Sequence, residues 1–325
     1  MGKTPAPKSD SDFWKEALEF FLTWGDKLRP AGSSTDKYND HSVIKLLAMT
    51  YWVGIFVPIV RTKLVEPYGY SMVYLDTMAG SGVTETARKG DFFVGSCPAA
   101  WIAAERMRHP FDAIIAVEPN AKRAQSLRAR LQVLLPTARV RVFEQELEDV
   151  SAIIHGWFEK KATSFAFIDP EGFDGMTWAG LEPILGLKGD AMVTWFEKGA
   201  FRLKEAALSQ ANNAPANRQR LDDLFGQGVW RGATSAQELT DLFCRRVEGS
   251  CKKLPAQQFT VEVRDGEHYK VILFAGEGCP EDLPARWLSQ MKRRVRPGMD
   301  IATLIDLEKG RAKTLFDDYS SRADH

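Results

Sequence analysis

The sequence predicts an α/β protein with a mainly parallel central sheet, and three observations predict this fold class. Short apolar runs rich in β-branched residues alternate with stretches of helical periodicity, as in strands joined by helical crossovers. The run at 71–76 ends in an acid and is followed by a Gly-rich turn, which is typical of a strand-to-turn junction in an α/β unit. Near the C-terminus, the strand-like runs 258–264 and 268–275 are separated by Asp265-Gly266-Glu267, a strong signal for an antiparallel hairpin.

The N-terminal part of the chain is predicted to be helical. Residues 1–12 are rich in Pro, Ser and Lys, and we expect them to form a disordered tail. Residues 13–70 are expected to form a helical lead-in packed on the core. Within it, 13–28 has helical spacing, and about 40–63 predicts one or two helices with a break near Pro58, because proline interrupts the helical hydrogen-bond ladder.

Residues 71–290 are expected to form one Rossmann-like domain. Its first strand is 71–76, and an amphipathic helix over 121–135 follows the second strand. The later strands are predicted at 111–117, 139–143, 165–168 and 191–196. With the final hairpin they make a seven-stranded sheet. Residues 291–325 are expected to form a basic and helical C-terminal extension.

Composition excludes several classes of protein. The 325 residues include 43 Lys+Arg and 43 Asp+Glu, so no global field attracts nucleic acid or an anionic membrane, and any polyanion site must be a local patch. Four cysteines without a CxxC pair and five dispersed histidines predict neither disulfides nor a metal site. The start of the chain has no apolar leader, and the apolar stretch 46–60 is too short to span a bilayer. We therefore expect a cytoplasmic protein without a membrane partner.

The segment LDTMAGSG carries the first candidate site. Asp76 ends the strand, and Gly80 and Gly82 stand where the chain must turn sharply and let a ligand approach the backbone. The loop is expected to open a helix, whose amides and dipole favour a carboxylate or a phosphate. We therefore assign cofactor binding to Asp76, Met78, Ala79, Gly80 and Gly82, with an ordinary tight turn as the alternative.

Two acids after the following strands extend this cofactor site. Glu118 follows the second strand, where a carboxylate can accept from both ribose hydroxyls of a nucleoside. Glu146 follows the third strand and can accept from an adenine amino group. The neighbouring Glu144 and Glu148 leave a solvated, charged loop as the alternative interpretation there.

Asp169 and Pro170 are the candidate catalytic residues. They leave the fourth strand beside the crevice where a parallel sheet binds ligands. An acid in this position can accept from or orient a nucleophilic amine, and Pro170 stiffens the chain. A turn with a capping Asp is the alternative. The chain contains neither GxSxG nor GxxxxGK[ST], so acyl-enzyme and P-loop chemistry lack their usual signals.

A basic run follows the predicted amphipathic helix 282–291. Lys292, Arg293, Arg294 and Arg296 place four positive charges within five residues, which is enough to contact nucleic-acid phosphates. The alternative is a solvated helix end, favoured by the negative end of the helix dipole.

The motifs resemble those of class I S-adenosylmethionine-dependent methyltransferases. LDTMAGSG resembles motif I of this family, Glu118 resembles the motif II acid, and FIDPEG resembles motif IV. The three occur along the chain in the order that the family has. AGSG resembles motif I of RNA and DNA base methyltransferases. That family has a D/N-P-P-aromatic motif IV, whereas this chain reads DPEGF, without the second Pro and with the aromatic residue displaced.

A closer resemblance is to the three-Cys-motif partner (TcmP) family, over about residues 37–292. It is carried by KYNDHSVIKLLAMTYW, YLDTMAGSG, GSCP, IDPEG, HYKVILFA and a helix bearing Trp287. The resemblance implies a methyltransferase-like fold and a protein partner that resembles radical SAM enzymes and carries the three cysteines.

Three functional hypotheses follow. The first is a methyltransferase that uses S-adenosyl-L-methionine as cofactor and acts on nucleic acid. The second is a non-catalytic or cofactor-binding subunit of a radical-SAM-like three-Cys-motif protein, favoured by the missing second Pro. The third, a dinucleotide-dependent oxidoreductase, shares the Gly turn but ranks lowest, because a terminal antiparallel hairpin fits a methyltransferase sheet better.

Overall fold

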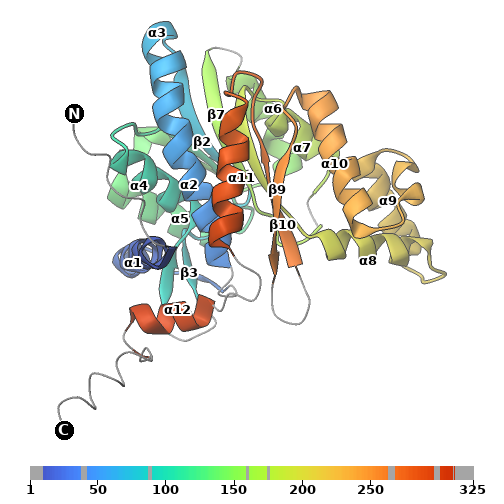
Figure 1. Cartoon of the computed structure of the whole chain (residues 1–325), viewed down its shortest axis with the longest axis horizontal. Coiled ribbons are helices and arrows are strands. Elements are labelled where there is room, and N and C mark those ends of the chain that lie inside the picture. The colour runs from blue at the N-terminus through green and yellow to red at the C-terminus, as the bar shows by residue number, and fades with distance from the viewer. Residues whose placement is uncertain are drawn as a thin grey trace.

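The computed structural model describes residues 10–37, 42–86, 90–158, 161–173, 176–262, 268–295, 301–309 and 311 (Figure 1). Its centre is a seven-stranded sheet in the order β6-β5-β2-β7-β8-β10-β9. The strands are β2 (Ser71–Asp76), β5 (Ala113–Val117), β6 (Val140–Phe143), β7 (Ala162–Ile168), β8 (Gly189–Trp195), β9 (Gln257–Glu262) and β10 (His268–Phe274). Neighbours from β6 to β8 are parallel, and β10 is antiparallel to both β8 and β9. The predicted seven-stranded, mainly parallel sheet with its C-terminal antiparallel pair is confirmed. The turn residues 265–267 lie outside the described residues.

Helices cover both faces of the sheet. Along β2, Met72 and Tyr74 pack into one hydrophobic cluster while Val73 and Leu75 pack into the other, as the two-residue period of a strand requires. The first cluster takes α1 (Asp10–Leu28), α2 (Ser42–Val60), α4 (Ser96–Arg106), α5 (Ala121–Leu134), α11 (Asp282–Arg294) and α12 (Ile301–Glu308). The second takes α6 (Leu147–Trp157), α7 (Trp178–Leu185), α8 (Glu197–Leu208), α9 (Ala214–Phe225) and α10 (Ala236–Cys251). Burial on both faces explains why the strands read as continuous apolar runs.

The lead-in differs from the sequence prediction at two places. Asp10, predicted within the tail, begins helix α1. The expected break at Pro58 is absent, because α2 runs through it into a π-helical stretch, Arg61–Val65, and then into α3 (Glu66–Tyr68). An internal proline costs about 3 kcal/mol, and the many buried apolar side chains of α2 offset this cost through tertiary packing.

The continuous helix Ser42–Tyr68 corrects the expectation that this apolar stretch is too short to span a bilayer. Its 27 residues are long and apolar enough to cross a membrane by length and composition alone. However, 67% of its most apolar window is buried inside the protein. Trp52, for example, donates to the buried carboxylate of Asp190 and makes an edge contact with Trp287. The helix is therefore apolar because it packs against the sheet and α11.

Candidate functional site

Three acids lie at one edge of the sheet. Asp76 ends β2, Glu118 follows β5 directly, and Asp169 follows β7 directly. These strands are parallel neighbours in the order β5-β2-β7, and Asp76 is in register with Ala116 and Phe167. The carboxyl ends of parallel strands meet at the edge where such sheets bind ligands. The structure therefore brings the three sequence-predicted acids together.

The Gly-rich loop after β2 is held between the two neighbouring strands. The Thr77 amide donates to the carbonyl of Phe167 (3.1 Å), and the Ala79 amide donates to the carbonyl of Val117 (3.0 Å). Gly80 and Gly82 then adopt φ values of +60° and +83°, which favour glycine. These contacts hold the loop against the edge of the sheet, and the positive φ values confirm the sharp turn predicted at the two glycines.

The loop does not open directly into a helix, and that expectation is wrong. A short hairpin, β3 (Val83–Glu85) with β4 (Phe92–Val94), separates it from α4. The Gly95 amide then donates to the carbonyl of Gly82 (2.8 Å), so the N-terminus of α4 returns to the loop. β1 (Asp36–Lys37) pairs with β3 in parallel and completes a small second sheet. The strands of this insertion are only two or three residues long, too short to show a period, which is why sequence periodicity missed them.

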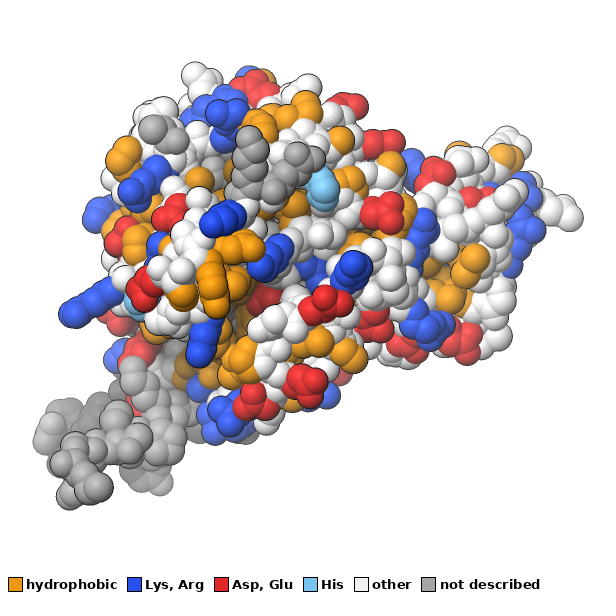
Figure 2. Space-filling model, turned by 90° about the horizontal axis from the view of Figure 1, so that it is seen from above, with side chains coloured by type: hydrophobic (Ala, Val, Ile, Leu, Met, Phe, Trp, Pro, Cys, Tyr) orange, Lys and Arg blue, Asp and Glu red, His pale blue; other side chains and the backbone are white. Residues whose placement is uncertain are grey.

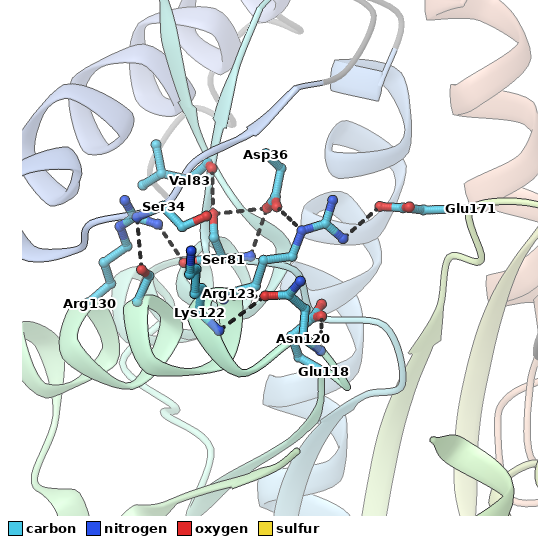
Figure 3. A network of polar contacts seen from close by, with 11 residues as sticks. Ser34, Asp36, Ser81, Val83, Glu118, Asn120, Lys122, Arg123, Arg130 and Glu171 are labelled. Atoms are coloured by element: carbon cyan, nitrogen blue, oxygen red, sulfur yellow. Dashed lines mark hydrogen bonds and ion pairs between the residues drawn. The ribbon is translucent and has the colours of Figure 1, made fainter. Parts of the chain in front are cut away.

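Asp36, which sequence reasoning missed, occupies part of the predicted anion position. Its Oδ2 accepts from the Ser81 amide (2.7 Å) and from the Ser81 hydroxyl (3.0 Å) (Figure 3). Burial raises the pKa of Asp36. A Cβ at Gly80 would stand 2.5 Å from the same Oδ2, so glycine is needed to admit the carboxylate. The Ser81 amide is therefore satisfied within the chain, and a bound anion must use other donors.

Arg123 joins three parts of the site. From the first turn of α5, its guanidinium lies 3.0 Å from Asp36 Oδ1 and 3.0 Å from Glu171 Oε1 (Figure 3). Asp36 belongs to the lead-in and Glu171 to the segment after β7. Arg123 thus ties the lead-in, α5 and that segment together around the edge of the sheet.

Asp76 is an internal acid. Its carboxylate is fully buried and accepts from the Tyr74 hydroxyl (3.1 Å), the Met78 amide (3.3 Å) and the Cys97 thiol (3.5 Å). Burial raises the pKa of Asp76 from 3.8 to about 6. The carboxylate links the end of β2, the Gly-rich loop and the start of α4, so it helps to fix the conformation of the loop.

We expect the unfolding free energy of the wild type, relative to Asp76→Asn, to depend on pH. Because the pKa rises from 3.8 to about 6 on folding, the folded state binds the proton more tightly, and the charged form costs stability. The wild type should lose roughly 3 kcal/mol relative to the variant as the pH rises from about 3 to about 7. Urea unfolding across this range measures it, and a constant difference would contradict the raised pKa.

Glu118 and Glu146 have different environments. Glu118 is buried, and its Oε1 accepts from the Asn120 amide (2.9 Å), while burial raises its pKa. Its position at the end of β5 beside the Gly-rich loop suits recognition of a polar ligand. Glu146 stands at the N-terminal cap of α6 with an exposed side chain. The two lie at the same sheet edge, because β5 and β6 are parallel neighbours.

Asp169 is paired with Lys45, a residue that sequence reasoning missed. Lys45 Nζ lies 2.8 Å from Asp169 Oδ1, and the two side chains are 11% and 25% exposed. The ammonium also stands over the rings of Phe196 (5.5 Å) and Tyr269 (5.0 Å). The signal was present in the sequence, because Lys45 is the one charged residue in the apolar segment Ser42–Val60. The lead-in thus supplies a cation to the candidate catalytic position, while Pro170 is buried beside it.

A second polar cluster missed by sequence reasoning begins one residue beyond Phe196. Glu197 is buried and accepts from His268 Nε2 (3.0 Å) and from Lys270 Nζ (2.9 Å). Glu197 starts α8, and the other two residues lie on β10 on either side of Tyr269. Alternation along β10 sends them to the sheet face opposite Tyr269.

The basic end of α11 divides into exposed and inward-facing residues. Lys292 and Arg293 are exposed, whereas the Arg294 guanidinium lies 3.7 Å from the ring centre of Phe13 and 5.0 Å from that of Tyr51. Arg296 lies outside the described residues. The amphipathic periodicity of α11 explains the division, because every third or fourth side chain returns to the core.

Comparison with known proteins gives distant similarities. No protein-family model and no curated protein matches the chain. A Legionella pneumophila protein of the DUF519 family is 13% identical, with a TM-score of 0.47, over 80% of this chain and 94% of its own. An O-methyltransferase from Bacillus cereus in complex with S-adenosylhomocysteine is 14% identical, with a TM-score of 0.38, over 83% of this chain and 92% of its own. A putative O-methyltransferase from Klebsiella pneumoniae is 13% identical, with a TM-score of 0.36, over 83% of this chain and 92% of its own. The case for function therefore depends on the site itself.

Proposed function

We propose that this protein is an S-adenosylmethionine-dependent methyltransferase. The observation that carries the proposal is the placement of Asp76, Glu118 and Asp169 at the carboxyl ends of three neighbouring parallel strands, around a Gly-rich loop. The antiparallel strand β10 between β8 and β9 fits the same assignment. In this proposal the cofactor lies across β2 and β5, and the methyl acceptor lies toward β7.

The donor and acceptor set fits S-adenosylmethionine. Glu118 offers a buried carboxylate whose Oε1 accepts a hydrogen bond from the Asn120 amide. The remaining lone pairs of the carboxylate can accept from ribose hydroxyls. The backbone of Met78 and Ala79 is fixed by Asp76 and Val117, so the loop presents a rigid surface. Arg123 supplies a positive charge at the same edge. When bound, the cofactor supplies an electrophilic methyl group on a sulfonium.

The residues after β7 are suited to orienting an acceptor. Asp169 Oδ1 is held by Lys45, so the carboxylate has a fixed position and a second oxygen to accept from an amine or hydroxyl. Phe196 and Tyr269 flank this pair with apolar ring surface. The catalytic contribution of the protein is then mainly alignment, because a well-oriented acceptor removes much of the entropic barrier.

Calorimetry with S-adenosylhomocysteine tests the cofactor assignment. We expect one-to-one binding, and we expect Glu118→Ala to weaken it about tenfold or more, since a hydrogen-bonded carboxylate is worth roughly 1.5–3 kcal/mol. Glu144→Ala, at a neighbouring exposed acid, is the matched control and should retain wild-type affinity. Absence of binding by the wild type would reject the cofactor and favour the partner-subunit alternative.

Nucleic acid is the acceptor class that we propose. Strand β10 is antiparallel to β8 and therefore ends at the amino edge of the sheet. Helix α11 then runs back toward the carboxyl edge, so its last residues, which include Lys292 and Arg293, lie nearer that edge (Figure 1). Two exposed cations there can contact phosphates beside Asp169 while the overall charge stays balanced. Arg294 is engaged with aromatic rings and contributes packing.

Salt dependence tests this acceptor class. Changing Lys292 and Arg293 to Gln should weaken RNA or DNA binding and lower the slope of log affinity against log salt by up to roughly 1.4–1.8. Arg139 and Lys161, exposed at the amino edge of the sheet just before β6 and β7, are the control pair, and their Gln variants should keep the wild-type slope. A wild type that binds no nucleic acid at low salt would overturn the proposal.

A further inference from the structure

A large cavity lies at the amino edge of the sheet, away from the candidate site. Its volume is about 770 Å³, and the starts of β7 and β8 border it through Thr163 and Asp190. Thr163 and Asp169 are six residues apart along one extended chain, which separates the two sites by about 20 Å. The cavity is therefore distinct from the edge that carries Asp76, Glu118 and Asp169.

One wall of the cavity is apolar and comes mainly from α2 and its π-helical continuation. Along this wall, side chains recur at helical spacing and present rings and branched chains to the space. They are Trp52, Ile55, Phe56, Ile59, Val60 and Leu64. The volume falls within the range of about 300–1,000 Å³ that is usual for small-molecule sites, and apolar walls with a few polar groups are typical of them.

The charged residues of the lining are predominantly positive. Four lysines and two acids line the cavity: Lys63, Lys188, Lys252, Lys253, Asp190 and Glu277. Figure 2 looks onto this end of the molecule, where α3 lies, and shows hydrophobic side chains between those of Lys and Arg. The excess of positive charge favours an anionic ligand over a cationic one.

The two buried charges in the lining support the same preference. Asp190 has both oxygens engaged, because Oδ1 accepts from the Gly276 amide (2.8 Å) and Oδ2 accepts from Trp52 Nε1 (3.0 Å). Lys253 is 8% exposed and donates to the carbonyls of Leu187 (2.9 Å) and Gly189 (2.7 Å). An ammonium has three donors, so in the described part of the chain Lys253 retains one for a ligand.

We propose that this cavity binds a small amphipathic anion, an apolar chain bearing one carboxylate. The chain would lie along Phe56 and Ile59, and the carboxylate would face the lysines of the lining. This site is independent of the methyltransferase assignment, since it shares no residue with the candidate site.

Calorimetric titration with dodecanoate, below its micelle-forming concentration, tests the proposal. We expect saturable one-to-one binding, and binding of dodecyltrimethylammonium, a cation of the same chain length, weaker by about tenfold or more. Ile59→Trp fills the cavity and should weaken dodecanoate binding by at least about tenfold. Lys63→Gln, at an exposed position, should weaken it severalfold without affecting the fold.

Ile153→Trp is the matched control, because Ile153 is 49% exposed on α6, outside the cavity lining. It should bind dodecanoate as the wild type does. The proposal is overturned by the absence of saturable dodecanoate binding, by equal binding of the cation, or by equal affinities of Ile59→Trp and Ile153→Trp. S-adenosylhomocysteine titration of each variant is a separate readout, and unchanged affinity there would show that the carboxyl edge is intact.

Discussion

Asp169→Asn should reduce methyl transfer by roughly 10²–10⁴-fold while S-adenosylhomocysteine affinity stays at the wild-type value. The substitution keeps the size of the side chain but removes the charge that pairs with Lys45. Asp169 follows β7, on the acceptor side of the site, whereas the cofactor is assigned to the loop after β2 and to Glu118 after β5. The acceptor therefore loses its oriented partner while the cofactor keeps its contacts.

Transfer of a labelled methyl group from S-adenosylmethionine to RNA and DNA measures this effect. Glu105→Gln is the control, because Glu105 is exposed near the C-terminal end of α4, outside the candidate site. It should transfer at nearly the wild-type rate. Equal loss of S-adenosylhomocysteine affinity in Asp169→Asn would reassign Asp169 to the cofactor site.

The sheet could be predicted because its strands are buried on both faces. Runs such as 113–117 are apolar throughout, and their alternation with amphipathic helices leaves few other folds. The acids Asp76, Glu118 and Asp169 could also be placed at one edge, since each ends a parallel strand. Pattern and topology alone determine these features.

The remaining residues of the site depend on contacts between distant segments. Asp36 reaches Ser81, 45 residues later, from a two-residue strand that has no periodic signal. Lys45 reaches Asp169 across 124 residues. An isolated cation in an apolar helix indicates that it has a partner but does not identify it. Long-range pairing of this kind is a property of the packed structure.

Proline and arginine positions show a second limit of sequence patterns. Pro58 would end an exposed helix, but the burial of α2 outweighs its cost. Arg294 belongs to a basic run, yet its guanidinium packs on Phe13 and Tyr51 because the helix face turns it inward. In both cases tertiary packing outweighs a local preference.

Gly95→Ala should destabilise the protein and weaken cofactor binding together. A Cβ at Gly95 would stand 2.7 Å from the backbone of Gly82, which the Gly95 amide also contacts. Gly95 has φ −75°, so the backbone conformation suits alanine and only the lack of space opposes it. Separating the N-terminus of α4 from the loop should cost roughly 1–3 kcal/mol of unfolding free energy, as overpacking does. Displacement of the loop should lower S-adenosylhomocysteine affinity about tenfold or more.

Gly54→Ala is the matched control, because a Cβ there meets nothing within 4 Å and the residue lies inside α2. Alanine within a helix is favoured over glycine by about 0.5–1 kcal/mol, so this variant should unfold at a slightly higher urea concentration than the wild type. The two glycine variants should therefore shift stability in opposite directions, and only Gly95→Ala should change cofactor affinity. Equal urea midpoints for the two variants would show that the contact between Gly82 and Gly95 does not constrain the loop, and the rigid-loop account of the cofactor site would fail with it.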